Sequence, residues 1–135
     1  MKNHYEQALN QYKNIDLQAR IEEATPYELI LLLLQGARSH ISSAINHIEH
    51  KQLSQKGERI GKAISILDEL RHALNHDVDP QMTGNLDQLY DYIQRILLKA
   101  NLDNSTDLLR EAAALLGQVH TAWLGVNEKA SGTTG

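Results

Sequence analysis

The chain has 135 residues, which is enough for one domain with a substantial core and short for two. Its net charge of −4 at pH 7 provides no basic stripe for phosphates, so we expect binding neither to nucleic acid nor to anionic membrane surfaces. Cysteine and phenylalanine are absent and proline occurs only at positions 26 and 80, so the composition favours an all-α protein over one that contains sheets.

No targeting signal is visible in the sequence. The N-terminus, MKNHYEQALNQYKN, lacks the apolar segment and small-residue cleavage site of a signal peptide. The apolar run Leu29–Leu34 is far shorter than the roughly 20 residues that a membrane-spanning helix needs. Because there is also no cysteine to stabilise an extracellular fold, we expect a cytoplasmic protein.

Residues 1–20 are predicted to form an N-terminal amphipathic arm. At helical spacing, one face of this segment carries Tyr5, Ala8, Leu9, Tyr12 and Ile15. The other faces are too polar for a core, so we expect the arm to dock as a short amphipathic helix on a bundle made by residues 21–126.

The first long helix is predicted to begin at Pro26. Thr25 can cap the helix, proline suits the first helical position, and Glu28 can complete a capping box. Apolar residues then recur by threes and fours until the pattern runs out near His50, and we expect them in the core: Ile30, Leu34, Ala37, Ile41, Ala44, Ile45 and Ile48.

Two further helices follow with the same periodicity. Ser54 is the expected cap of the second, and the turn-forming residues 75–80 end it. The third begins between Pro80 and Asn85 and ends at residues 101–105. Short connections between helices of similar length favour antiparallel neighbours.

The fourth helix is predicted to be capped by Ser105 and to place Trp123 at the end of its apolar stripe. After it, residues 127–135 are polar and rich in glycine, so we expect a disordered tail. The sequence therefore predicts an all-α, antiparallel up-down four-helix bundle with an N-terminal arm.

Several apolar side chains fall outside these core stripes. Leu32 lies about 200° around the first helix from Ile30 and so points nearly opposite the core. Helical geometry makes a set of residues candidates for a partner-binding groove, of which Leu70 also belongs to the core stripe of the second helix: Leu32, Ile66, Leu70, Ala73, Tyr92 and Leu98. The arm, a second copy of the chain or a partner helix could each cover them.

Catalytic and metal-binding patterns are weak. A di-iron bundle needs two Glu-x-x-His motifs, and the chain has one such spacing, Glu69 to His72. His72 and His76 are four residues apart and could bind zinc with Asp77 or Asp79 if the helix continued that far, but two histidines on a solvated helix end are far more often polar surface. We expect no metal, no cofactor and no enzymatic activity.

Three features together resemble a known family. They are ATPYELILLLLQGA at residues 24–37, NLDQLYDYIQRILLKANLDN at residues 85–104, and the late Trp123. From about Leu9 to Trp123 the chain is similar to the flagellin-specific export chaperones of bacteria, the FliS family. One departure is MTGN at residues 82–85, where the family usually carries a Gly-Gly pair before the third helix.

The resemblance implies a chaperone that binds the C-terminal segment of flagellin, prevents its premature polymerisation and assists its delivery to the flagellar export gate. It implies that Tyr12, with Leu9 beside it, contacts this client, and that the N-terminal segment can cover the client-binding surface. Tyr5 shares the face of these two residues and is a further candidate. The alternative is a structural or regulatory bundle whose apolar patches form a homo-oligomer interface, for example a homodimer.

Overall fold

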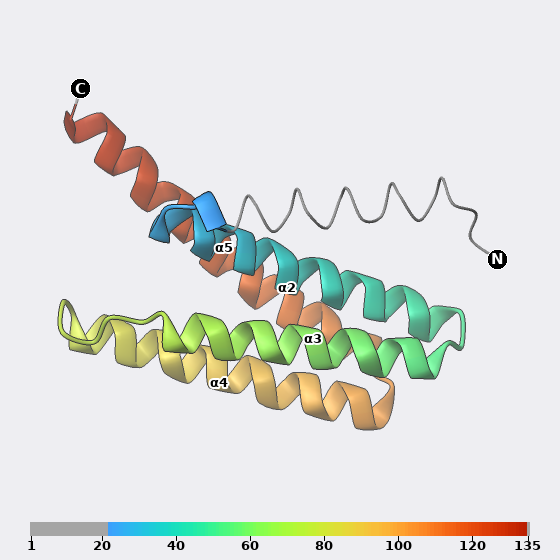
Figure 1. The fold of residues 1–135 in the computed structure, drawn as a ribbon. Helices are drawn as coiled ribbons and strands as arrows, with labels where there is room; N and C mark the ends of the chain where they lie inside the picture. Colours follow the sequence, from blue (N-terminus) through green and yellow to red (C-terminus); the bar gives the residue numbers. More distant parts are fainter. Residues whose placement is uncertain (1–21, 135) are drawn as a thin grey trace, which may run out of the picture.

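A computed structural model describes the backbone of residues 22–134 and the side chains of residues 22–126. Its helices are α2 (Pro26–Glu49), α3 (Leu53–His72), α4 (Pro80–Asp103) and α5 (Thr106–Thr134), as Figure 1 shows. Each helix packs against the next, and α5 also packs against α2, so the four close into a bundle. The predicted all-α four-helix bundle is confirmed. The predicted arm, with Tyr5, Leu9 and Tyr12, lies outside the described residues.

The helix starts agree with the predicted caps at two positions. The Thr25 hydroxyl accepts a hydrogen bond from the Glu28 backbone N–H at 3.1 Å, immediately before Pro26. The Ser105 hydroxyl accepts one from the Leu108 N–H at the same distance. Both bonds satisfy amides that have no partner in the first helical turn.

The predicted cap of α3 is wrong. The helix begins at Leu53, and Ser54 lies inside its first turn. The reason is the tight connection after α2, in which Lys51 adopts a left-handed conformation with φ of 58° and the Gln52 N–H donates to the His47 carbonyl. Because this turn is so tight, α3 begins one residue before Ser54.

Helix α4 begins within the predicted window, with Pro80 in its first turn and the Asp79 carboxylate accepting a hydrogen bond from the Met82 N–H. At the other end of the chain, α5 continues to Thr134, whereas a disordered tail was predicted from residue 127. No proline interrupts this stretch, and Glu128, Lys129 and Ala130 are good helix formers, so the helical backbone can continue.

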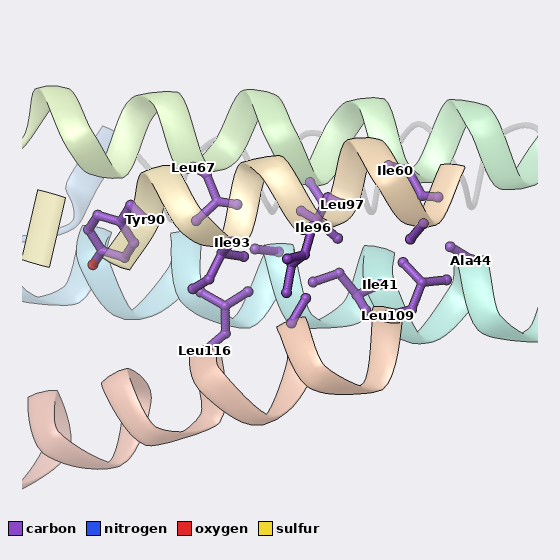
Figure 2. Close-up of a cluster of buried hydrophobic side chains, with 14 of the residues drawn as sticks. Ile41, Ala44, Ile60, Leu67, Tyr90, Ile93, Ile96, Leu97, Leu109 and Leu116 are labelled. Atoms are coloured by element: carbon purple, nitrogen blue, oxygen red, sulfur yellow. The ribbon is translucent and has the colours of Figure 1, made fainter. Parts of the chain in front are cut away.

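The core lies along the bundle axis and consists of aliphatic side chains from all four helices. Figure 2 shows them converging between the ribbons. Alanines alternate with larger residues, which lets the helices approach closely and fill the interior. The fully or nearly fully buried apolar residues are Leu34, Ala37, Ile41, Ala44, Ile60, Ala63, Leu67, Leu70, Tyr90, Ile93, Ile96, Leu97, Ala100, Leu109, Ala112 and Leu116. Of the core residues predicted for the first helix, Leu34, Ala37, Ile41 and Ala44 are buried, whereas Ile30, Ile45 and Ile48 are half-buried and pack against this core.

A polar cluster joins α3 to α4 beside this core. The Arg71 guanidinium donates to both carboxylate oxygens of Asp87, at 2.7 and 3.2 Å, and to the Gln94 side-chain oxygen at 2.9 Å. The Gln94 amide donates in turn to Asp68 and to the Ile64 carbonyl. The hydrogen bond from Arg71 lowers the pKa of Asp87 below its ordinary value.

Candidate functional site

One end of the bundle carries three adjoining apolar cavities, which we call the terminal groove. They lie where α2 begins, α3 ends, α4 begins and the second half of α5 passes, and Trp123 lines all three. Their volumes are about 280, 370 and 400 Å³. Cavities of this size with mostly apolar walls are typical of binding sites.

The first cavity lies where the end of α3 and the start of α4 face α5. Its apolar lining consists of Ile30, Leu70, Ala73, Leu74, Val78, Met82, Leu86, Tyr90, Val119 and Trp123. Val78 is 79% exposed and Met82 is 60% exposed, so large apolar surfaces stand open to solvent at its rim. Covering such surfaces with a partner is favourable because burial of apolar area removes it from water.

The second cavity separates α4 from α5. On the α4 side it is lined by Met82, Leu86 and Leu89, and on the α5 side by Val119, Ala122 and Val126, among others. The third lies between the first turn of α2 and the end of α3, where Tyr27, Ile30 and Ala73 meet Trp123. The three cavities share walls and therefore form one continuous apolar surface.

Two polar residues of the groove, Asp79 and Thr83, are engaged within the chain. Asp79 caps α4, and the Thr83 hydroxyl, which is buried, donates to the Asp79 carbonyl. Burial raises the pKa of Tyr90 to about 12, so its hydroxyl stays neutral. The groove therefore presents mainly carbon and offers few free polar groups to a ligand.

Trp123 is anchored to α2 on the side away from the first two cavities. Its ring stacks on that of Tyr27 with centroids 5.4 Å apart and an interplanar angle of 15°. The Trp123 indole N–H donates to the Tyr27 carbonyl at 3.2 Å, and the Tyr27 hydroxyl donates to the Trp123 carbonyl at 3.3 Å. Beyond this pair, Leu124 and Val126 are 43% and 55% exposed, and Figure 1 shows the end of α5 projecting away from the α3–α4 turn.

Two of the predicted groove residues lie at the terminal groove. Ala73, at the end of α3, lines the first and third cavities. Leu70 lines the first, but it is only 1% exposed and belongs to the core, so it is the floor of the cavity and not an accessible contact.

The other predicted groove residues within the described part lie elsewhere. Ile66 is half-buried in the α2–α3 interface, with its Cδ1 3.4 Å from the position that a Cβ on Gly36 would occupy. Leu32 is half-buried and lines a separate hollow on α2.

Tyr92 and Leu98 are exposed on α4 and line none of the three cavities of the groove. The Tyr92 hydroxyl donates to the Glu111 carboxylate at 2.8 Å, and this bond holds the pKa of Tyr92 above its ordinary value. Rotation around a helix axis correctly indicates that these two side chains are exposed, but it does not say which of them lie on the same surface.

Sequence reasoning missed several groove residues, above all Val78, Met82 and Val126. Val78 belongs to a segment interpreted only as a turn, and Met82 to a segment interpreted only as a helix start. The available signal was the presence of apolar residues in otherwise polar connections. Trp123 was placed in the core stripe, and it does pack against the core while also lining the groove.

Within residues 22–134, none of the helices combines the length and apolar character that crossing a membrane requires.

An antiparallel helical bundle with an open apolar groove at one end is an architecture suited to binding an amphipathic helix or peptide. A family model described as Flagellar protein FliS matches residues 8–130, and this chain belongs to that family.

Curated relatives match most of the chain. The flagellar secretion chaperone FliSB of Pseudomonas aeruginosa is 40% identical over 120 residues, which cover 89% of this chain and 95% of the relative. The flagellar secretion chaperone FliS of Salmonella typhimurium is 35% identical, with 89% and 90% covered. That of Bacillus subtilis is 33% identical, with 78% of each covered.

Proposed function

We propose that this protein is a cytoplasmic export chaperone that binds the C-terminal segment of flagellin in the terminal groove. Binding would prevent premature polymerisation of flagellin and assist its delivery to the flagellar export apparatus. Family membership and the names of its relatives, which are flagellar secretion chaperones, support the coarse role. The open apolar groove is the observation that supports its mechanism.

The proposed mechanism requires no catalytic residue. A client segment that packs as an amphipathic helix in its final assembly presents an unsatisfied apolar stripe when it is free. The terminal groove offers a complementary apolar surface, used in the helix-in-groove mode. Full burial of one leucine is worth about 1.5–3 kcal/mol, so a few anchors can hold a client even after the cost of ordering it.

The arm is proposed to take part in client binding. The family resemblance implies that Tyr12 and Leu9 contact the client, and the spacing of Tyr5 predicts the same face if this segment is helical. A segment that competes with the client would lower its apparent affinity and make binding reversible. Such competition also shields an apolar surface from aggregation when no client is present.

The direct test compares two variants, each with a glutamate substituted for an apolar residue of α4. Met82→Glu places a charge in the groove, and we expect it to weaken binding of the cognate flagellin C-terminal segment at least tenfold, because the charge must be desolvated. The melting temperature should change little, since Met82 is 60% exposed and Glu suits a first helical turn. Leu102→Glu, at a residue 83% exposed and away from the groove, should leave binding unchanged. Isothermal titration calorimetry measures both.

Absence of binding by the unmodified chain at micromolar concentrations would contradict the proposal, as would equal losses in the two variants. The alternative function, a bundle whose patches pair with a second copy, predicts a tight oligomer that ignores flagellin. Light scattering with and without the flagellin segment distinguishes the two functions.

A further inference from the structure

The stacked pair formed by Tyr27 and Trp123 joins the backbones of two helices. Each side chain donates its hydrogen bond to the main-chain carbonyl of the other residue, at 3.3 and 3.2 Å. Bonds that end on main-chain oxygens fix the backbones of α2 and α5 relative to each other. Ordinary packing of two side chains would not require this reciprocal pattern.

The pair stands where α5 separates from α4. Nearer the middle of the two helices, Tyr92 on α4 donates directly to Glu111 on α5, so the helices are in contact there. Toward the start of α4, the cavity of about 400 Å³ opens between Leu86 and Val119. The second half of α5 thus leaves α4 and contacts α2 through Tyr27, and Figure 1 shows α5 diverging from α4 and running on past the start of α2.

An open gap between two apolar walls needs a restraint. Movement of α5 toward α4 would bury exposed surface of Met82 and Val126, and the hydrophobic effect favours such closure. Among the α5 residues whose side chains are described, Trp123 is the one nearest the C-terminus that packs against the core, so it is the point at which that part of α5 can be held back. Besides this packing, Tyr27 holds it by ring stacking and by two hydrogen bonds.

We propose that the pair formed by Tyr27 and Trp123 is a positioning device: it ties the second half of α5 to α2 and thereby keeps the terminal groove open for a client. The inference rests on the proposed function for the identity of that client, but the effect on groove width is a property of this chain alone. Tyr27 and Trp123 act by setting the distance between the walls of the groove.

The test measures the distance between α4 and α5 directly. The chain has no cysteine, so Gln81→Cys on α4 and Thr121→Cys on α5, both exposed and outside the groove lining, carry spin labels at defined sites. Distance distributions are recorded by pulsed electron paramagnetic resonance in this labelled parent and after adding Tyr27→Phe or Trp123→Phe. Tyr27→Phe removes one hydrogen bond and keeps an aromatic ring, so the fold should survive.

The matched control is Arg110→Gln. It removes another tie between α2 and α5, the ion pair of Arg110 with Glu49 at 3.4 Å, which lies at the opposite end of the bundle. We expect shorter, broader distances in Tyr27→Phe and Trp123→Phe and unchanged distances in the control. Binding of the flagellin segment should weaken about fivefold in Tyr27→Phe, the factor that corresponds to loss of one hydrogen bond.

Distances in both aromatic variants identical to the parent would overturn the inference, whatever the affinity. A shift equally large in Arg110→Gln would overturn it too, because the effect would then be general loosening of α5. Shifted distances in a protein that binds no flagellin segment would support the positioning role and contradict the proposed function, so the two can fail separately.

Discussion

Single residues at the groove divide into those that carry the fold and those that are free to bind. Leu70 and Val78 are close in sequence and line the same cavity, yet they are 1% and 79% exposed. A substitution at the first must act through stability, and one at the second can act on binding alone. Separate measurements of stability and affinity are therefore needed for every groove variant.

Leu70→Ala should lower the free energy of unfolding by about 2–5 kcal/mol, the range for truncation of a buried leucine that leaves a cavity. Denaturant unfolding followed by circular dichroism measures it. Leu102→Ala is the matched control, and at a residue 83% exposed it should cost under about 0.5 kcal/mol. A small effect at Leu70 would mean that it is a surface contact and not core.

Residue spacing predicts burial better than it predicts surface sites. The core positions follow from recurrence by threes and fours, which is a local property of each helix. The spacing predicts Tyr92 at the edge of the core stripe and Leu98 outside it, and both are exposed. Whether exposed residues share a groove depends on neighbouring helices, which no single helix specifies.

At the scale of whole elements, α3 and α4 are held together by charge as well as by the core. Arg71 bonds to Asp87, and both side chains are about one-third exposed. Because solvent screens such a pair, its contribution to stability should be about 1 kcal/mol or less.

This pair has a definite pH dependence. The pKa of Asp87 is lowered in the fold, so its stabilisation is present above the unfolded pKa and is lost as the pH falls through the lower folded pKa. Asp87→Asn should therefore be less stable than the wild type at pH 7, and the difference should shrink at pH 3. Urea unfolding at the two pH values measures it, and an equal difference at both would contradict the assignment.

Glycine in α3 limits the stability of that element. Gly61 is exposed in the helix interior, and a Cβ added there would meet no atom within 4 Å. Gly61→Ala should raise the free energy of unfolding by about 0.5–1 kcal/mol, because alanine loses less backbone entropy on folding.

The matched control for this gain is Gly36→Ala on α2. There the new Cβ would lie 3.4 Å from Ile66 Cδ1, so the gain should be smaller. Thermal unfolding of both variants decides the matter. A larger gain at Gly36 than at Gly61 would show that filling space at the α2–α3 interface outweighs helix propensity.

The limits of the helices were predictable where one side chain makes the cap. Thr25 and Ser105 cap as expected because each hydroxyl accepts a hydrogen bond from the backbone N–H three residues later. The start of α3 was missed because it depends on the left-handed conformation of Lys51 and on a main-chain bond to His47. A turn that is made by main-chain hydrogen bonds can be formed by many side chains, so it is hard to predict from the sequence.

For the molecule as a whole, the proposed function depends on the angle between helices. The groove exists because α5 contacts α2 through Tyr27 and leaves α4 near Leu86, which is a non-local property of the bundle. The family resemblance indicated an apolar client-binding surface in advance, but neither it nor helical periodicity placed that surface around Trp123. The sequence therefore predicted the architecture well and the position of the groove only at Ala73 and Leu70.

The central claim is that the terminal groove is where the client binds, and the single tryptophan of the chain tests it most directly. Trp123 lines all three cavities. When a tryptophan-free peptide with the sequence of the flagellin C-terminal segment binds, the fluorescence emission of Trp123 should therefore shift to shorter wavelength as water leaves the groove. We expect a saturable shift with a dissociation constant in the micromolar range or below. Binding detected by calorimetry without any change in Trp123 emission, or no binding at all, would contradict the claim.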